Sequence, residues 1–287
     1  MMNHKTLNEP IIIIGNPRSG TSLLRIMLNS HPNIVIPPEC GFIQWWHEQY
    51  KGWNASFTSA NVELYVNDVL GSKKIETYEL DKENLIEHIN QIRPKSYSEL
   101  SACIPISYAS SKPIKRWGDK NNYYIHHIPL IKDIYPNARF IHITRDGRDV
   151  ASSYLELSNS FSKGTKYLPN FPSGIEAIST AWTKNIATIE SGLSKTNLIT
   201  VRYEDIVLDT ITVLKQILDF VECKWSEQVC NYIDYNDEPK VTAAWKEKTF
   251  SPIDPSGIGR FGTDLTGDQL DQFMAIAKPT LQRLGYA

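Results

Sequence analysis

The sequence predicts an α/β protein in which helices cover both faces of a central, mainly parallel sheet of about five strands. Two observations lead to this three-layer α/β/α class. Short apolar runs alternate along the chain with longer segments of helical periodicity, which is the pattern of successive strand–helix–strand units. In addition, two of the runs are dense in Ile and Phe, as expected of central strands that are covered on both faces.

Five segments have the length and composition of strands. They are Ile11–Ile14, Asn33–Ile36, Ile114–Trp117, Arg139–Thr144 and Leu198–Arg202. The first and the fourth are the two Ile- and Phe-rich runs, and they are therefore expected in the middle of the sheet.

Helices are expected between and after these strands, wherever apolar residues recur with helical spacing. The expected helices cover residues 23–28, 82–92, 128–135, 150–157, 174–192, 209–221 and 266–284. Asp81 is expected to cap the second, and Thr266 with Gln269 forms the capping-box pattern at the start of the last. Residues 40–113 are otherwise less regular, 158–173 and 236–262 are predicted to be loops, and residues 1–287 are expected to form one domain.

Composition excludes several classes of protein. Of the 287 residues, 41% are hydrophobic and 22% are charged, which is typical of a globular chain. The net charge of −2 gives no sign of a nucleic-acid partner. The four cysteines lack the spacing of a metal site, so no metal is expected. No apolar run is long enough for a membrane span or a signal peptide, which favours a cytoplasmic location.

The first strand leads into Gly15-Asn-Pro-Arg-Ser-Gly-Thr-Ser22 and then directly into a helix. This spacing is that of the phosphate-binding P-loop, whose backbone N–H groups and helix N-terminus hold an anion. Arg18, Ser19, Gly20, Thr21 and Ser22 are therefore candidate binding residues. Thr21 occupies the position of the motif lysine, which argues against hydrolysis of ATP, and Arg18 is expected to supply the cation instead.

A second anion site is predicted where the fourth strand ends, at Arg145-Asp-Gly-Arg-Asp-Val-Ala-Ser-Ser153. Arg145 lies at the carboxyl end of a parallel strand, which is where open α/β sheets bind ligands. Arginine holds phosphate through two N–H groups and Ser153 offers a hydroxyl, so the pair suits a phosphate group.

With these two motifs the chain resembles the sulfotransferases that use 3′-phosphoadenosine 5′-phosphosulfate (PAPS), a P-loop family with an α/β/α fold. Residues 17–22 resemble the family's 5′-phosphosulfate loop, and residues 145–153 its 3′-phosphate motif. Gly257-Ile-Gly-Arg260-Phe-Gly resembles a late basic loop, in which Arg260 would close over the 3′-phosphate. Arg202-Tyr-Glu-Asp resembles a strand end at which Tyr203 would lie near the adenine.

The same resemblance suggests catalytic residues. Glu39 follows the second strand, as does the glutamate base of tyrosylprotein and many bacterial sulfotransferases. Asp119-Lys120 resembles the Asp-Lys pair of that branch, in which the lysine assists the leaving group. Arg18 is assigned to catalysis as well as to donor binding, because it would stabilise the transferring group. His126 and His127 remain alternative bases.

Residues 40–113 would then form part of the acceptor site. Their aromatic residues Trp45, Trp46, Tyr50 and Trp53 suit either acceptor binding or a local core. The resemblance therefore implies a nucleotide-binding transferase that moves a sulfuryl group from PAPS to a hydroxyl or amine of a small molecule, glycan or lipid. A P-loop kinase that uses ATP and an inactive nucleotide-binding protein are the two alternatives.

Overall fold

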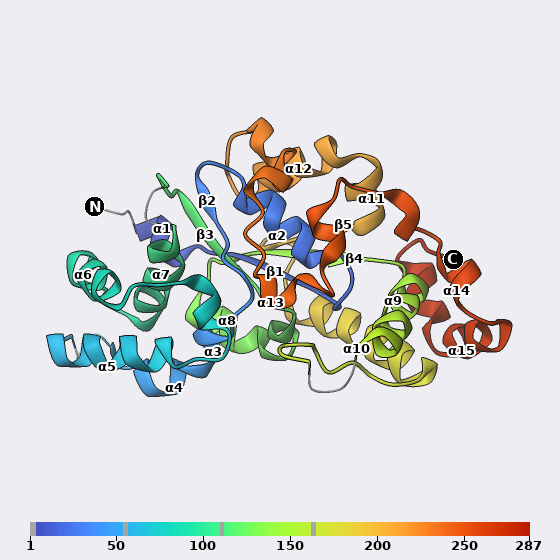
Figure 1. Cartoon of the computed structure of the whole chain (residues 1–287), viewed down its shortest axis with the longest axis horizontal. Helices are drawn as coiled ribbons and strands as arrows, with labels where there is room; N and C mark the ends of the chain where they lie inside the picture. The colour runs from blue at the N-terminus through green and yellow to red at the C-terminus, as the bar shows by residue number, and fades with distance from the viewer. Residues whose placement is uncertain (1–3, 54–56, 110–111, 162–164) are drawn as a thin grey trace.

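The structure, a computed structural model, describes residues 4–53, 57–109, 112–161 and 165–287. Within these residues the centre is a five-stranded sheet in the order β2-β3-β1-β4-β5, and every neighbouring pair is parallel (Figure 1). The strands are β1 (Ile11–Gly15), β2 (Ile34–Val35), β3 (Arg116–Lys120), β4 (Arg139–Thr144) and β5 (Leu198–Arg202). The predicted fold class is confirmed, and β1 and β4 lie centrally, as expected.

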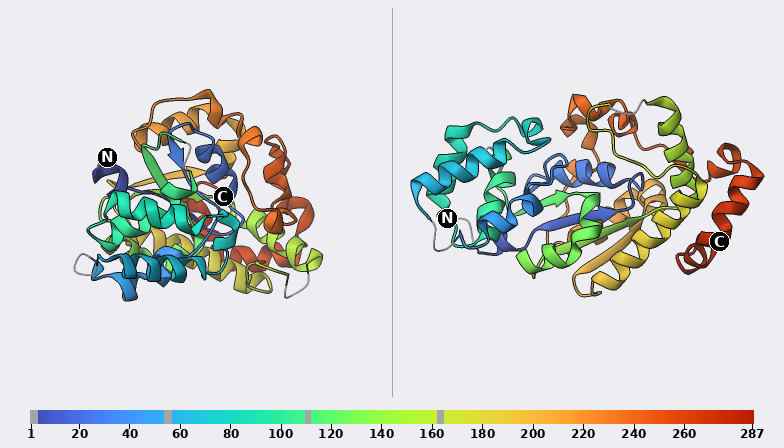
Figure 2. Two further views of the ribbon diagram at one scale, coloured as in Figure 1. Left: turned by 60° about the vertical axis from the view of Figure 1, so that its left-hand side comes forward. Right: turned by 90° about the horizontal axis from the view of Figure 1, so that it is seen from below.

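Helices cover both faces of this sheet because successive side chains of each strand point to opposite faces. Ile11 and Ile13 of β1 pack with α2 (Thr21–Asn29) and α12 (Thr210–Phe220) on one face. Ile12 and Ile14 belong to the apolar cluster of the other face, to which α8 (Ile128–Ile134) and α10 (Ile175–Gly192) contribute. The two views of Figure 2 show the sheet lying between these helical layers.

Most of the predicted helices are present with small differences in their ends. In addition to those already named they are α6 (Lys82–Ile92), α9 (Gly147–Ser160) and α15 (Gly267–Arg283). Asp81 caps α6, and Thr266 and Gln269 form the expected capping box at the start of α15. Helix α9 begins earlier than predicted, because the Asp146 side chain accepts a hydrogen bond from the Arg148 backbone N–H.

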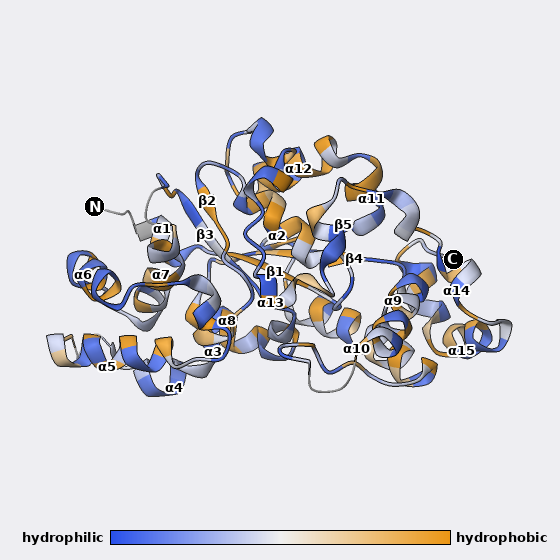
Figure 3. Cartoon of the chain, viewed as in Figure 1, coloured by the Kyte–Doolittle hydropathy of each residue, from blue (hydrophilic) through white to orange (hydrophobic). Residues whose placement is uncertain are grey.

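The expectation that residues 40–113 are less regular is wrong for most of their described part. It contains α3 (Phe42–Trp45), α4 (His47–Tyr50), α5 (Ser59–Leu70), the 3₁₀ turn η2 (Ile75–Tyr78), α6 and α7 (Tyr97–Tyr108). Helix α7 is buried along most of its length and contains Pro105, so it shows no single apolar stripe in the sequence. Figure 3 shows the contrast between the apolar strand β1 and the many polar residues of α6.

Of the two segments predicted to be loops, 158–173 holds the end of α9 and otherwise no helix or strand in its described residues, whereas 236–262 contains short helical turns. Residues 236–262 include α13 (Lys240–Ala243), η6 (Glu247–Phe250) and η7 (Pro255–Gly257), and α14 (Phe261–Asp264) begins at their end. The remaining short elements are α1 (His4–Asn8), η3 (Asn122–His127), α11 (Tyr203–Leu208), η4 (Glu227–Val229) and η5 (Tyr232–Tyr235). Across the described part of the chain, no helix has the length and apolarity that a membrane crossing requires.

Candidate active site

All five strands point the same way, so their carboxyl ends and the segments that follow them meet at one edge of the sheet. The strand register decides which residues become neighbours there. Thr144 pairs with Arg202, and Arg145 and Tyr203 come next on their strands. Val35 pairs with Trp117, and the chain beyond them carries Glu39 on one side and Lys120 on the other. The edge therefore brings together two clusters, one around Arg145 and one around Glu39.

The loop after β1 has a backbone that only certain residues tolerate. Gly20 has φ 93° and Arg18 has φ 73°, both in the left-handed region that glycine favours. A Cβ at Gly20 would also meet the Tyr203 ring at 2.6 Å. The loop leads directly into α2, and no side chain of the described residues caps the N-terminus of that helix. Its first N–H groups, at Thr21 and Ser22, are therefore left for an anion.

Arg145 holds the donor-side loops against one another. Its Nη1 donates to the carbonyl oxygen of Arg18 at 2.9 Å, and its Nη2 donates to that of Gly257 at 2.5 Å. The guanidinium lies 4.5 Å from the centre of the Tyr203 ring. The P-loop, the strand end of Tyr203 and the late basic loop therefore converge on one arginine.

Arg18 completes the cationic cluster. Its Nε donates to Ser153 Oγ at 3.0 Å, so the two sequence motifs are in contact. Burial, followed by repulsion from Arg145, lowers the pKa of Arg18 to about 10, and Arg260 adds to the repulsion. Two buried polar atoms here, Ser19 Oγ and Arg145 Nε, have no hydrogen-bond partner among the described residues. Crowded cations and unused donors are features that suit an anion.

Arg260 approaches this cluster but pairs elsewhere. Its Nη1 donates to Glu156 at 2.8 Å and its Nε to Asp264 at 2.5 Å. The loop that carries it is fixed by Asp149, which accepts hydrogen bonds from the backbone N–H groups of Gly259 and Phe261 at 2.8 and 3.0 Å. Sequence reasoning missed this role of Asp149, although the residue lies inside the predicted 3′-phosphate motif.

Glu39 and Lys120, the predicted catalytic pair, are in direct contact. Lys120 Nζ donates to Glu39 Oε2 at 2.5 Å, and Lys74 Nζ donates to Oε1 at 2.9 Å. Lys120 is buried at the end of β3. Burial alone would raise the pKa of Glu39, but Lys120 and Lys74 together hold it far below its usual range. The carboxylate is therefore ionised and tightly held by two cations.

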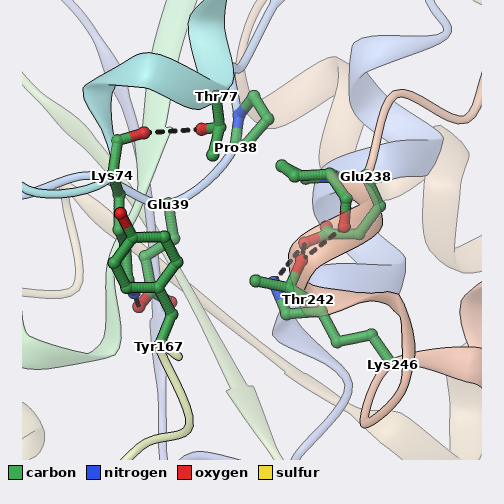
Figure 4. Close-up of a pocket in the computed structure, with 9 residues that line it drawn as sticks. Pro38, Glu39, Lys74, Thr77, Tyr167, Glu238, Thr242 and Lys246 are labelled. Carbon is green, nitrogen blue, oxygen red and sulfur yellow. Dashed lines mark hydrogen bonds and ion pairs between the residues drawn. The ribbon is translucent and has the colours of Figure 1, made fainter. Parts of the chain in front are cut away.

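A small pocket opens beside this pair (Figure 4). It is lined by Pro38, Glu39, Lys74, Thr77, Tyr167, Glu238, Pro239, Thr242 and Lys246. Lys74 comes from the turn before η2 and Lys246 from the segment after α13. No sequence motif pointed to either lysine, and the length of the unassigned 236–262 segment was the only signal for the second.

Asp119 and the two alternative bases, His126 and His127, lie on the stretch of chain around Lys120. Burial raises the pKa of Asp119 to about 7, although Tyr124 donates a hydrogen bond to its Oδ2 at 2.5 Å. His126 and His127, the alternative bases, lie at the end of η3 with their rings against Tyr123. Burial lowers the pKa of His127.

The aromatic residues of the 40–53 segment divide between two environments. Tyr50 and Trp53 are buried and pack edge to face, which agrees with the local-core interpretation. Trp46 is partly buried and donates to Ser72 Oγ at 2.8 Å. Trp45 is 45% exposed. None of the four lines the pocket of Figure 4.

Comparisons with known proteins point to one family. The model of the Sulfotransferase family matches residues 10–227, which include the P-loop, Glu39, Lys120 and Arg145. Protein-tyrosine sulfotransferase 2 of Gallus gallus is 23% identical over 286 residues, which cover 96% of this chain and 69% of the relative.

Solved structures with the same fold extend the comparison. The sulfotransferase domain from the curacin biosynthetic pathway superposes with a TM-score of 0.63 at 19% identity and covers 98% of both chains. A mouse sulfotransferase in complex with PAP has a TM-score of 0.55 at 13% identity and covers 98% of this chain and 91% of its own. At these identities the likeness is one of fold.

Proposed function

The chain belongs to the sulfotransferase family, and on that premise we propose that it moves a sulfuryl group from PAPS to a hydroxyl or amine acceptor, with Glu39 as the base. The observation that carries this proposal is the juxtaposition at one sheet edge of the Arg18–Arg145–Ser153 cluster and the Glu39–Lys120 pair. The first suits a doubly phosphorylated nucleotide and the second suits proton removal from an acceptor.

The donor side fits PAPS in its charge and in its unused hydrogen-bond donors. The N–H groups at the start of α2, together with Ser19 Oγ, would hold the 5′-phosphosulfate. Arg145 and Ser153 would hold the 3′-phosphate, and Arg260 would reach it by leaving Glu156. Tyr203, under the Arg145 guanidinium, would lie beside the adenine. The solved mouse relative that contains PAP supports this choice of nucleotide.

The acceptor side supplies a base and a cation. Glu39 takes the proton of the acceptor hydroxyl while the acceptor oxygen forms a bond to sulfur. The bond from sulfur to the donor phosphate oxygen breaks in line, and 3′,5′-phosphoadenosine (PAP) departs. Lys120 and Arg18 stabilise the charge that grows on the departing side. The proton ends on Glu39, and the sulfuryl group ends on the acceptor.

Glu39 must be freed before it can act. While Lys120 and Lys74 both donate to it, its depressed pKa makes the carboxylate a weak base. A donor phosphosulfate offers Lys120 a second set of oxygens, and a shift of the ammonium toward them would raise the pKa of Glu39. The base would thus gain strength only when the donor is in place.

The pocket constrains the acceptor near its reacting atom. Its lining is rich in charged and hydroxyl groups, so a polar hydroxyl or amine is suited to it better than an apolar body. A small molecule, a glycan or a lipid headgroup could supply that hydroxyl. Relatives named for protein tyrosine make a phenolic hydroxyl the first acceptor to test.

The experiment has two stages. Calorimetry with PAP and with ADP plus Mg²⁺ tests the nucleotide. PAP is expected to bind at least about 100-fold more tightly, because two charge-assisted hydrogen bonds to the 3′-phosphate are worth about 1.5–3 kcal/mol each. PAPS is then offered with 4-nitrophenol, a tyrosine peptide, a sugar amine and an aliphatic alcohol. Equal affinities would contradict the donor assignment, and tighter ADP binding would favour the kinase alternative.

A further inference from the structure

The segment from Asp237 to Lys246 touches both halves of the site. The carbonyl oxygen of Trp245 accepts a hydrogen bond from Arg18 Nη1 at 2.9 Å, so the chain at this point lies against the P-loop. The next residue, Lys246, lines the pocket that also contains Glu39 (Figure 4). A group that moves from the P-loop to an acceptor at Glu39 therefore passes close to Lys246.

Lys246 is held in place by a buried chain of charges. Its Nζ donates to Glu238 Oε1, which also accepts from Thr242 Oγ1 at 2.8 Å. The other oxygen of Glu238 accepts from Arg25 Nη2 at 3.0 Å. Arg25 and Glu238 are 0% and 1% exposed, and the Lys246 side chain is 14% exposed. Thr242 and Arg25 thus fix the Glu238 carboxylate, and the carboxylate in turn fixes the ammonium of Lys246.

The charges around the pocket do not cancel. Arg25 pairs with Asp237 and Glu238, and Lys246 shares Glu238 with it. Lys74 and Lys120 both pair with Glu39. Among the groups that line the pocket or pair with its lining, four cations therefore face three carboxylates. A fourth carboxyl group, Asp119, lies next to Lys120, but burial and the charge of Glu39 raise its pKa to about 7, so it does not fully cancel the excess. The excess positive charge lies in a largely buried place where it is poorly screened. Such an excess suits the oxygens of a transferring sulfuryl group.

We propose that Lys246 is a further catalytic residue, whose ammonium contacts an oxygen of the transferring sulfuryl group, and that Glu238 and Arg25 are positioning residues that act through it. The inference rests on the proposed function. Lys120 would serve the departing oxygen and Lys246 a non-bridging oxygen, so the two lysines would act on different atoms of one group.

The pH dependence offers a specific signature. Lys246 faces Glu238 from its own segment, Glu39 and Lys74 across the pocket, and Lys120 from β3. Burial, followed by repulsion from Lys120, lowers the pKa of Lys246 to about 8. The rate is therefore expected to fall above pH 8 in the unmodified protein. In Lys246→Arg that fall should be absent, because a guanidinium stays charged.

The test uses single-turnover transfer from PAPS to 4-nitrophenol and calorimetric affinity for PAP. Lys246→Met should lower the rate by about 10²-fold, as expected for the loss of one preorganised donor to the transition state, with PAP affinity changed less than about threefold. Lys240→Met is the matched control, since Lys240 is an exposed lysine at the start of α13. It should transfer at the unmodified rate.

The double variant Lys246→Met with Glu238→Gln separates catalysis from structure. If Lys246 served only to neutralise Glu238, the double variant would recover the rate, which would overturn the inference, as would a Lys246→Met rate equal to that of Lys240→Met. A rate that stays low in the double variant, with PAP still bound, supports it. An unmodified protein that binds no PAP, or that transfers from PAPS to none of the four acceptors, overturns the proposed function first, and the inference with it; if another of the four is the acceptor, it replaces 4-nitrophenol in all the rate measurements.

Discussion

Lys120 donates a 2.5 Å hydrogen bond to the Glu39 carboxylate, so the end of β3 and the segment after β2 are joined by an ion pair. The two residues were expected to serve opposite partners of the reaction, the lysine on the donor side and the glutamate on the acceptor side. Their contact means that a single movement of the lysine changes the charge on both sides. The first two predictions follow from this pair.

Glu39→Gln should abolish most of the transfer activity while donor binding persists. The amide keeps the shape of the side chain but cannot accept the acceptor proton, a role worth about 10²–10⁴ in rate. Single-turnover rates with PAPS and 4-nitrophenol measure the loss, and calorimetry with PAP provides the control. A variant that transfers at the unmodified rate would exclude Glu39 as the base and return attention to His126 and His127.

Lys120→Met should move the acidic limb of the rate profile to higher pH. In the unmodified protein the lysines hold the pKa of Glu39 far below its usual range, so the carboxylate stays ionised in mildly acidic solution. Removing one cation destabilises the ionised form, and the pKa of Glu39 rises. Measurement of kcat/KM between pH 4 and 8 tests the shift.

Lys74→Met is the matched comparison for Lys120→Met. Lys74 also donates to Glu39, at 2.9 Å, so its loss should move the acidic limb in the same direction. Because Lys74 has no assigned contact with the leaving group, the rate plateau should fall less than in Lys120→Met. Equal plateaus in the two variants would contradict a role for Lys120 on the donor side.

Arg145→Met should weaken PAP binding by at least about 10-fold and ADP binding much less. One charge-assisted hydrogen bond is worth about 1.5–3 kcal/mol. ADP has no 3′-phosphate, so it does not make this bond and does not lose it in the variant. Arg148→Met is a suitable control, since Arg148 belongs to the same motif but pairs with Asp146 and donates to the Tyr286 carbonyl oxygen. A similar loss for both nucleotides would show that Arg145 acts on the loops and not on the 3′-phosphate.

The predicted donor-side motifs lie in contact in the structure, because each of them is local in the sequence. Residues 15–22 and 145–153 are each contiguous, and the parallel register brings their ends together without further information. The segment 114–120 shows the limit of apolar patterns. The predicted strand began at Ile114, whereas β3 contains Arg116, Asp119 and Lys120. Arg116 and Lys120 are buried because distant carboxylates pair with them, and no local pattern reveals such partners. Asp119 accepts a hydrogen bond from the nearby Tyr124.

The acceptor side was harder to predict for the same reason. Lys74 and Lys246 reach Glu39 or its neighbour Glu238 from segments far away in the chain. In the sequence, neither lysine can be told from an ordinary surface lysine. Their roles depend on tertiary contacts, which are fixed by how η2 and the 236–262 segment pack and not by spacing in the sequence.

A last prediction concerns His142, which lies on the central strand β4 and is 1% exposed. Neither ring nitrogen has a hydrogen-bond partner among the described residues, and burial lowers the pKa of His142 from 6.5 to about 4. The unfolded chain can therefore take up a proton at this residue between pH 6.5 and 4, while the folded chain cannot. Folding loses stability as the pH falls through that window, by up to about 3 kcal/mol from this group.

His142→Leu should remove this acid sensitivity, since leucine has no proton to bind in either state. Urea unfolding of both proteins at pH 7 and at pH 4.5 gives the two stability differences to compare. The variant should gain stability relative to the unmodified protein as the pH falls, and other titrating groups cancel in that comparison because both proteins share them. A difference that stays constant with pH would mean that His142 is protonated, or finds a partner, in the folded protein. In that case the unpaired ring nitrogens on β4 would have to lie within reach of water or of an acidic group.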